Sequence, residues 1–229
     1  MPIADRMTRR VADFAVIKNM FEEGRRLKER FGADNVYDFS LGNPDVPPPD
    51  AFRKALRELT QSDTLSFGYA PMAGHLPVRE ALAQRLTAEH GVPIRPEMIA
   101  MTVGAAGALN DIFRALVNPG DEILTPSPYF LGYDNYAFLV DADLITAATD
   151  QRFHLDLAAI AKTITWKTRV VLINSPNNPT GAVYTAEEIN GLGQVLGYIK
   201  MQGQAAQDLL AQNKISAADR GLEQLVAVA

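Results

Sequence analysis

Apolar runs and amphipathic stretches alternate along the middle of the chain. Short apolar runs typical of buried strands cover residues 99–103, 122–126, 143–146 and 169–173, and stretches with helical spacing cover residues 105–117, 129–139 and 156–164. Alternation at this spacing predicts parallel strands connected by helices that cover the sheet. The expected fold class is therefore α/β, a three-layer sandwich with a mostly parallel sheet.

Helical patterns dominate the beginning of the chain. Residues 11–31 carry apolar side chains between charged ones, as an amphipathic helix does. A second helix is expected at residues 50–59, capped by Asp50, and a third at residues 77–90, closed by Gly91. The run at residues 37–41 is strand-like, and a proline-rich connection that suits neither a helix nor a central strand follows it.

The end of the chain has a different composition, rich in alanine and glutamine after Tyr198. Its apolar residues suit one or two amphipathic helices that would cover the unfinished sheet; they are Leu209, Leu210, Ile215, Leu222, Leu225 and Val226. We therefore expect three segments: an N-terminal arm at residues 1–45, an α/β domain at residues 46–197 and an atypical helical tail at residues 198–229.

Composition narrows the class of protein. With 229 residues, 47% of them hydrophobic, the chain can bury a sizeable core, and no apolar run approaches the roughly 20 residues that span a bilayer. The absence of cysteine excludes disulfides, and His75, His90 and His154 are too scattered for a metal site. A net charge of −5 gives no basic surface for nucleic acid. From the composition as a whole we expect a cytoplasmic protein whose partners are neither nucleic acid nor membrane.

Polar amides follow the last apolar run at residues 174–181, Asn-Ser-Pro-Asn-Asn-Pro-Thr-Gly. Ligands of parallel α/β sheets bind at the carboxyl ends of strands, so a loop with two adjacent asparagines is a candidate site. The alternative is a plain tight turn, because Asn, Pro and Gly are the usual residues of turns.

Two other connections suit the same kind of ligand. Residues 102–109 join a strand to a helix through small residues, so that backbone N–H groups at a helix start can approach a phosphate; close helix–strand packing is the alternative. Tyr129 and Phe130 follow the next strand, where one ring could stack on a planar ligand, although aromatic rings more often serve packing alone.

In combination, these motifs resemble the class I/II, fold-type I aminotransferases that depend on pyridoxal phosphate. The resemblance runs in order from Tyr37 to Gly193. Its motifs are residues 42–44, Tyr69 with Gly74 and residues 78–82, residues 104–109, residues 126–133, and residues 174–181. The resemblance implies the major domain of that fold, present in incomplete form, with residues 46–197 binding the cofactor.

The resemblance also implies roles for individual residues. The backbone amides of Gly104, Ala105 and Ala106 are expected to bind the cofactor phosphate. The ring of Phe130, in preference to Tyr129, is expected to stack on the pyridine. Asn178 is expected to donate a hydrogen bond to the phenolic oxygen, with a cis bond between Asn178 and Pro179 as in relatives.

Two further residues concern the partner subunit and the substrate. Tyr69 resembles a tyrosine that reaches the phosphate held by the other subunit, which implies a homodimer. Gly42 resembles a glycine beside the substrate carboxylate. The implied reaction moves an amino group between an amino acid and a 2-oxo acid.

The chain departs from the family pattern after Gly193. No lysine that would hold the cofactor covalently can be assigned, and Lys200 and Lys214 are expected to be exposed helix residues. The catalytic residues are therefore unknown, and we expect a truncated aminotransferase that binds its cofactor weakly and is slow or inactive. Two alternatives stay open: a non-catalytic protein that keeps the fold for dimerisation or ligand binding, and another fold-type I enzyme such as a β-lyase or decarboxylase.

Overall fold

The computed structural model describes residues 3–39, 46–62, 68–212 and 225–228. The chain divides into two compact units, Met1–Tyr69 and Ala70–Ala229, and each is described by itself. The expected segment boundaries after residues 45 and 197 stay predictions.

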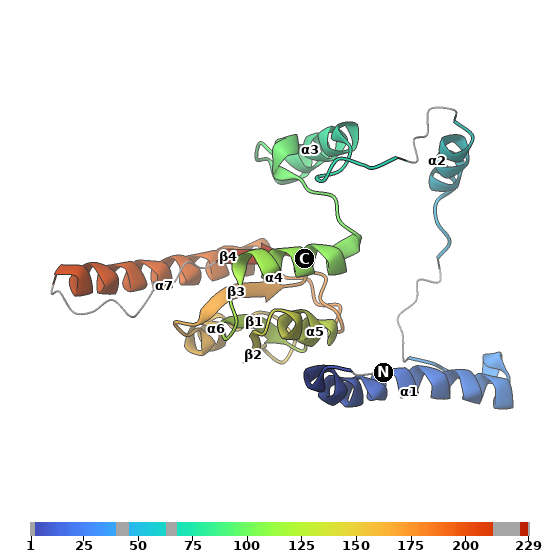
Figure 1. The fold of residues 1–229 in the computed structure, drawn as a ribbon, viewed down its shortest axis with the longest axis horizontal. Coiled ribbons are helices and arrows are strands. Elements are labelled where there is room, and N and C mark those ends of the chain that lie inside the picture. The colour runs from blue at the N-terminus through green and yellow to red at the C-terminus, as the bar shows by residue number, and fades with distance from the viewer. Residues whose placement is uncertain (1–2, 40–45, 63–67, 213–224, 229) are drawn as a thin grey trace. The chain divides into compact units, whose positions relative to one another are not determined.

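The second unit is built on a four-stranded parallel sheet. Its strands are β1 (Glu122–Ser127), β2 (Asp143–Ala148), β3 (Thr168–Ile173) and β4 (Leu225–Val228), in the order β2-β1-β3-β4 (Figure 1). The strands predicted at residues 122–126, 143–146 and 169–173 are confirmed. Both central strands are almost wholly buried, as strands covered on two faces must be.

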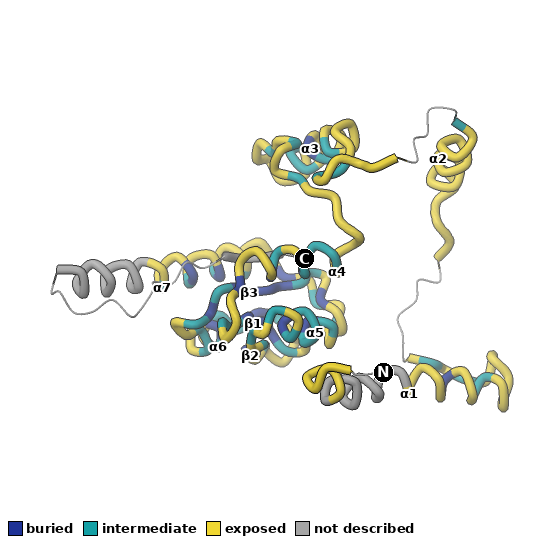
Figure 2. Tube along the Cα trace, in the orientation of Figure 1, coloured by how far each residue is buried: buried dark blue, intermediate teal, exposed yellow. Residues whose placement is uncertain are grey.

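Helices cover both faces of this sheet. Successive side chains of a strand point to opposite faces, so Ile123, Val170 and Leu172 pack under α4 (Gly104–Leu116) and α5 (Gly132–Leu139). Leu124, Val171 and Ile173 pack under α6 (Leu157–Thr163) and α7 (Ala186–Gln212). The three-layer sandwich is thereby confirmed, and Figure 2 shows the burial concentrated at β1 and β3.

Two helices of the second unit begin at side-chain caps. The side chain of Asp156 accepts from Ala159 N–H at 2.9 Å and starts α6. Before α7, Thr185 Oγ1 accepts from Glu188 N–H at 3.2 Å while Glu188 Oε2 accepts from Thr185 N–H at 2.7 Å. This reciprocal pair satisfies two backbone donors that a helix start leaves without partners.

The segment before α4 contains α3 (Leu76–His90) and the short helix η2 (Pro96–Met98). Gly91 closes α3 in the left-handed conformation with φ +68°, as predicted. The strand predicted at residues 99–103 is wrong. An apolar run becomes a strand only beside a strand that pairs with it, and among the described residues none pairs with this one, so Met101 and Val103 stay exposed.

The first unit consists of α1 (Asp5–Phe31), the short helix η1 (Ala33–Asn35) and α2 (Asp50–Thr60). Both long helices were predicted, but Asp50 is the first residue of α2 and makes no capping hydrogen bond. Residues 37–39 form no strand, and the rest of that predicted run lies outside the described residues.

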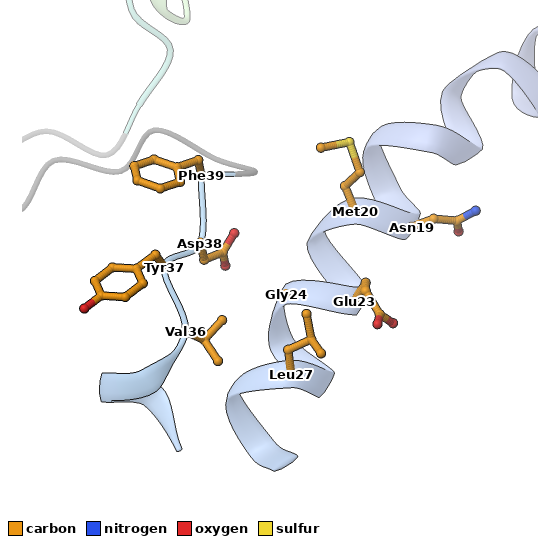
Figure 3. Close-up of a pocket in the computed structure, with 9 residues that line it drawn as sticks. All are labelled: Asn19, Met20, Glu23, Gly24, Leu27, Val36, Tyr37, Asp38 and Phe39. Carbon is orange, nitrogen blue, oxygen red and sulfur yellow. The ribbon is translucent and has the colours of Figure 1, made fainter. Parts of the chain in front are cut away.

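A shallow groove of about 640 Å³ separates α1 from residues 36–39 (Figure 3). Met20, Leu27 and Val36 line it, and an ion pair of 2.8 Å between Lys28 and Asp38 ties its two walls together. Among the residues of this unit whose burial is described, only Gly24 is buried, and it has no side chain. The first unit therefore has no apolar core in its described part.

The tail differs from its prediction in one respect. A single helix, α7, runs to Gln212, whereas Leu225 and Val226 belong to strand β4 and not to a helix. Apolar β-branched and aliphatic residues pair readily with an open sheet edge, and β3 offers one. Leu222 and Ile215 lie outside the described residues. In the described part of the chain, no helix is both long and apolar enough to span a bilayer.

Candidate functional site

Chain topology brings three of the predicted segments to one edge of the sheet. The parallel strands β1 and β3 end at the same edge, so the loop after Ser127 and the loop after Ile173 are both found there. Helix α4 packs on the sheet and leads into the start of β1 through a short connection, so its own start lies at the carboxyl edge as well (Figure 1). Open α/β sheets bind ligands at this edge.

The start of α4 has backbone N–H groups without acceptors in the described part of the chain. Gly104 N–H donates to Thr102 O at 2.9 Å and Gly107 N–H to Val103 O at 3.3 Å. Between them, the N–H groups of Ala105 and Ala106 have no acceptor anywhere in the described ranges. Gly104 has φ +66°, and a Cβ built on it would meet nothing within 4 Å. Free amides at the positive end of a helix suit a phosphate.

Of the two aromatic residues after β1, only Phe130 offers a free ring. Tyr129 is half-buried and its hydroxyl donates to Asp134 Oδ2 at 3.1 Å. The Phe130 ring is 41% exposed and meets the Tyr133 ring edge-on, with centroids 5.6 Å apart. A Cβ at Gly132 would overlap the Phe130 ring, so this glycine makes room for it. The Phe130 ring is thus available for the stacking role that the resemblance implies, which stays a prediction.

The two adjacent asparagines after β3 have opposite surroundings. Asn177 is 8% exposed, and its Oδ1 accepts from the hydroxyl of Thr180 at 2.9 Å and from Thr180 N–H at 3.2 Å. Burial raises the pKa of Tyr184, and the neighbouring Asn177 side chain partly opposes that shift. The side-chain oxygen of Asn177 is thus engaged within the protein.

Asn178 is exposed. Its backbone N–H donates to Asn174 Oδ1 at 2.8 Å, while its side-chain amide makes no hydrogen bond with any residue in the described parts of the chain. The bond between Asn178 and Pro179 is cis, as predicted. Asn178 therefore has a donor and an acceptor available for a ligand.

The remaining predicted site residues lie elsewhere. Tyr69 is the last residue of the first unit, and its side chain is fully exposed. Gly42 lies outside the described residues. Their roles stay predictions, as do those of Gly104, Ala105, Ala106, Phe130 and Asn178 toward a cofactor.

The described lysines of the second unit lie away from this edge. Lys162 ends α6 and Lys167 immediately precedes β3, so both are at the amino edge. Lys200 is exposed on α7, roughly 20 Å along the helix from Ala186 at about 1.5 Å per residue. A six-residue strand is itself about 20 Å long, so Lys200 has passed the far edge of the sheet. Lys214 lies outside the described residues.

The sequence predicts a helix start at Thr185 to Glu188, which α7 confirms, but the wider role of Glu188 was missed. Besides capping α7, Glu188 accepts from Leu155 N–H at 2.9 Å and contacts His154 Nδ1 at 3.1 Å, which fastens the loop after β3 to the turn before α6. Burial raises the pKa of Glu188, but these hydrogen bonds and those to Thr185 outweigh it and hold the pKa below its ordinary value. The spacing Thr-x-x-Glu signals the cap; nothing in the sequence signals His154.

These residues fit a small, planar, phosphorylated ligand: free amides for the phosphate, an exposed ring for stacking and an exposed amide for a ring substituent. In the described ranges no three His, Asp or Glu side chains gather as a metal site requires. The molecule is thus an α/β protein of the class that binds ligands at the carboxyl edge of a parallel sheet.

Comparison with known families makes the assignment specific. The family model described as aminotransferase class I and II matches residues 34–197. The chain belongs to this family, and the resemblance seen in the sequence is confirmed.

Curated relatives agree with the family. The aspartate/prephenate aminotransferase of Thermus thermophilus is 32% identical over 192 residues, 82% of this chain and 49% of the relative. The probable aspartate/prephenate aminotransferase of Aquifex aeolicus is 37% identical over 163 residues, 70% of this chain and 41% of the relative. The chain therefore spans about half the length of these curated relatives, or less.

Solved structures share the fold. The crystal structure of an amino transferase from Eubacterium rectale has a TM-score of 0.81 and 31% identity, with 100% of this chain and 54% of that chain covered. Alanine aminotransferase from Pyrococcus furiosus has a TM-score of 0.72 and 27% identity, with 80% of this chain and 47% of that chain covered.

Proposed function

We propose that the chain binds pyridoxal phosphate and serves amino-group transfer between an amino acid and a 2-oxo acid. One observation carries the proposal: the amides of Ala105 and Ala106 have no acceptor in the described protein and lie at the same sheet edge as Phe130 and Asn178. When bound, pyridoxal phosphate supplies a ring that withdraws electrons from the carbon bearing the amino group.

Each residue has a definite task in this proposal. The amides of Ala105 and Ala106 bind the phosphate at the start of α4, where Gly104 begins the helix with φ +66°. The Phe130 ring covers one face of the cofactor and excludes water from it. The side-chain amide of Asn178 donates to the phenolic oxygen and stabilises its negative charge.

The substrates and the assembly belong to the proposal too. The names of the relatives favour aspartate or prephenate chemistry, and the fully exposed Tyr69 is available to a phosphate held by a second copy. We therefore propose a homodimer with shared sites, located in the cytoplasm. Sedimentation of the purified chain tests the dimer, and substitution Tyr69→Phe tests whether the hydroxyl contributes to cofactor affinity.

The positions of the lysines favour a second function, non-covalent ligand binding without turnover. Lys162, Lys167 and Lys200 all lie away from the carboxyl edge, so no described lysine of the second unit is placed to hold the cofactor. Borohydride reduction of the loaded chain separates the two functions. Stoichiometric labelling of a single lysine supports the enzyme, whereas absent or scattered labelling supports the binding protein.

Titration of the purified chain with pyridoxal phosphate and with pyridoxal, followed by absorbance, tests the site itself. The phosphate should strengthen binding at least about tenfold, since charge-assisted hydrogen bonds contribute about 1.5–3 kcal/mol. Phe130→Leu and Asn178→Ala should each weaken binding of pyridoxal phosphate. Trp166→Leu at the opposite edge and Asn190→Ala on the exposed side of α7 serve as matched controls. Equal affinity for the two ligands would contradict the proposed phosphate site.

A further inference from the structure

The turn at residues 174–182 is held closed by hydrogen bonds within the protein. Asn177 N–H donates to Ala182 O at 2.8 Å, and Gly181 N–H donates back to Asn177 O at 2.7 Å. The side chains of Asn177 and Thr180 join inside this ring, and Thr180 Oγ1 also accepts from Ala182 N–H at 3.2 Å. Asn177 and Thr180, whose side chains hydrogen-bond within the loop, thus determine its shape.

Both ends of the turn are fastened to buried structure. Tyr184 is 5% exposed and packs in the core beneath α6 and α7, and its N–H donates to Ser175 Oγ at 2.9 Å. On the other side, Ser175 follows the buried strand β3 through Asn174, whose Oδ1 accepts from Asn178 N–H. The loop is therefore a rigid bracket rather than a loose connection.

This rigid turn exposes the side chain of Asn178. Its neighbours on both sides in sequence, Asn177 and Pro179, belong to the closed turn, while its own side chain is exposed and makes no hydrogen bond in the described protein. A donor whose backbone is held in advance loses less entropy on binding than one on a mobile segment. The position of Asn178 consequently depends on groups that never touch the ligand.

We propose that Asn177 and Thr180 are positioning residues, which hold Asn178 in the direction of the phenolic oxygen of the cofactor. This proposal rests on the proposed function for the identity of the ligand. It goes further in assigning affinity for one particular ring substituent to two side chains outside the binding surface, the buried Asn177 and the half-buried Thr180.

A double-mutant cycle with Thr180→Val and Asn178→Ala tests the proposal. Valine matches threonine in shape but removes the hydroxyl that donates to Asn177 and accepts from Ala182. Thr180→Val should weaken pyridoxal phosphate about tenfold in the parent and less than about twofold in the Asn178→Ala background. Equal losses in both backgrounds would show a merely structural role and overturn the proposal.

Two controls make the result specific. Thr180→Ser keeps the hydroxyl and should restore affinity to within about twofold of the parent. Thr163→Val removes a hydroxyl that donates to Ala159 O at 2.8 Å within α6, and should leave affinity unchanged. An analogue of the cofactor without the phenolic oxygen should bind the parent and Thr180→Val equally, and unequal binding would contradict the assigned contact.

A measurement without ligand separates this proposal from the proposed function. Amide hydrogen exchange of Asn177, Asn178 and Gly181 should be at least about tenfold faster in Thr180→Val than in the parent, with Thr163→Val as the control. If the parent fails to bind pyridoxal phosphate but exchange is faster in Thr180→Val, the proposed ligand is contradicted while the rigid turn held by Thr180 is supported. Unchanged exchange at these amides overturns the bracket, whatever the ligand.

Discussion

Gly104 combines a backbone requirement with a binding task. Its φ of +66° is a conformation that side-chain-bearing residues rarely adopt, and the next two amides are the proposed phosphate donors. A residue with a Cβ pays roughly 1–2 kcal/mol in this conformation. The site therefore depends on glycine for its backbone conformation, even though a Cβ at this position would meet no other atom within 4 Å.

We expect Gly104→Ala to lower the free energy of unfolding by about 1 kcal/mol and to weaken pyridoxal phosphate more than pyridoxal. Denaturant unfolding and absorbance titration measure the two effects. Gly193→Ala is the matched control, because Gly193 lies in the helix α7 with open space around it, and alanine there should stabilise by about 0.5–1 kcal/mol. A Gly104→Ala variant as stable as the parent would argue against strain at this position.

Gly132 is the second glycine with a local task. A Cβ at this position would overlap the far end of the Phe130 ring, which can rotate away at little cost to folding. We expect Gly132→Ala to leave the melting temperature within a few degrees of the parent but to weaken pyridoxal phosphate about three- to tenfold. Thermal denaturation and titration check this together, and a large loss of stability without loss of affinity would contradict it.

At the residue scale, sequence reasoning found the small residues of α4 and the exposed ring because each has a local reason. Gly104 begins a helix, and Phe130 follows a strand. No local rule of sequence assigns different roles to Asn177 and Asn178, since the two residues are identical and adjacent. Only packing decides that Asn177 is buried against Thr180 while Asn178 is exposed.

At the scale of elements, the strands β1, β2 and β3 were predictable because each is a short apolar run between turn residues. The same rule failed at residues 99–103 and at Leu225–Val228. Strand formation there depends on whether a partner is available, which is a property of the rest of the sheet and not of the run itself.

Glu188 joins the start of α7 to the turn before α6, so its substitution should lower the stability of the protein. Glu188→Gln removes charge-assisted hydrogen bonds to Thr185 and Leu155, and should cost about 1.5–3 kcal/mol of unfolding free energy at pH 7. Glu187→Gln, one residue earlier and exposed, should cost much less. Chemical denaturation of the three proteins measures the difference.

The effect of Glu188 should depend on pH in a definite direction. Because its folded-state pKa is lowered, the stabilisation is fully present above the ordinary glutamate pKa and is lost as the pH falls through the lowered value. The stability difference between parent and Glu188→Gln should therefore shrink on acidification. A difference that stays constant from neutral pH to pH 3 would contradict this assignment.

At the scale of the whole molecule, burial is unevenly shared. The second unit has two apolar clusters, one on each face of its sheet, whereas α2 has no buried residue and exposes Phe52, Leu56 and Leu59 along one side. Helices gain most of their stability from packing an apolar face, so α2 has little to hold it in the isolated chain.

Amide exchange should report this difference directly. Amides of β1 and β3 should exchange at least about a thousandfold more slowly than those of α2, because the strands open only with the core. Measurement over a range of protein concentrations adds a control. Protection of α2 that rises with concentration would show that a second copy covers its apolar side, and concentration-independent protection equal to that of β3 would contradict the expected difference.

The position of β4 in the sheet bears on how the chain folds during synthesis. The members of the two apolar clusters whose burial is described precede β4 along the chain, the last of them being Leu196 in α7. A ribosome releases the chain from its N-terminus, and domains begin to fold as they emerge. The described core can therefore form around β1, β2 and β3 while β4 is still being made, and β4 then joins an edge that already exists.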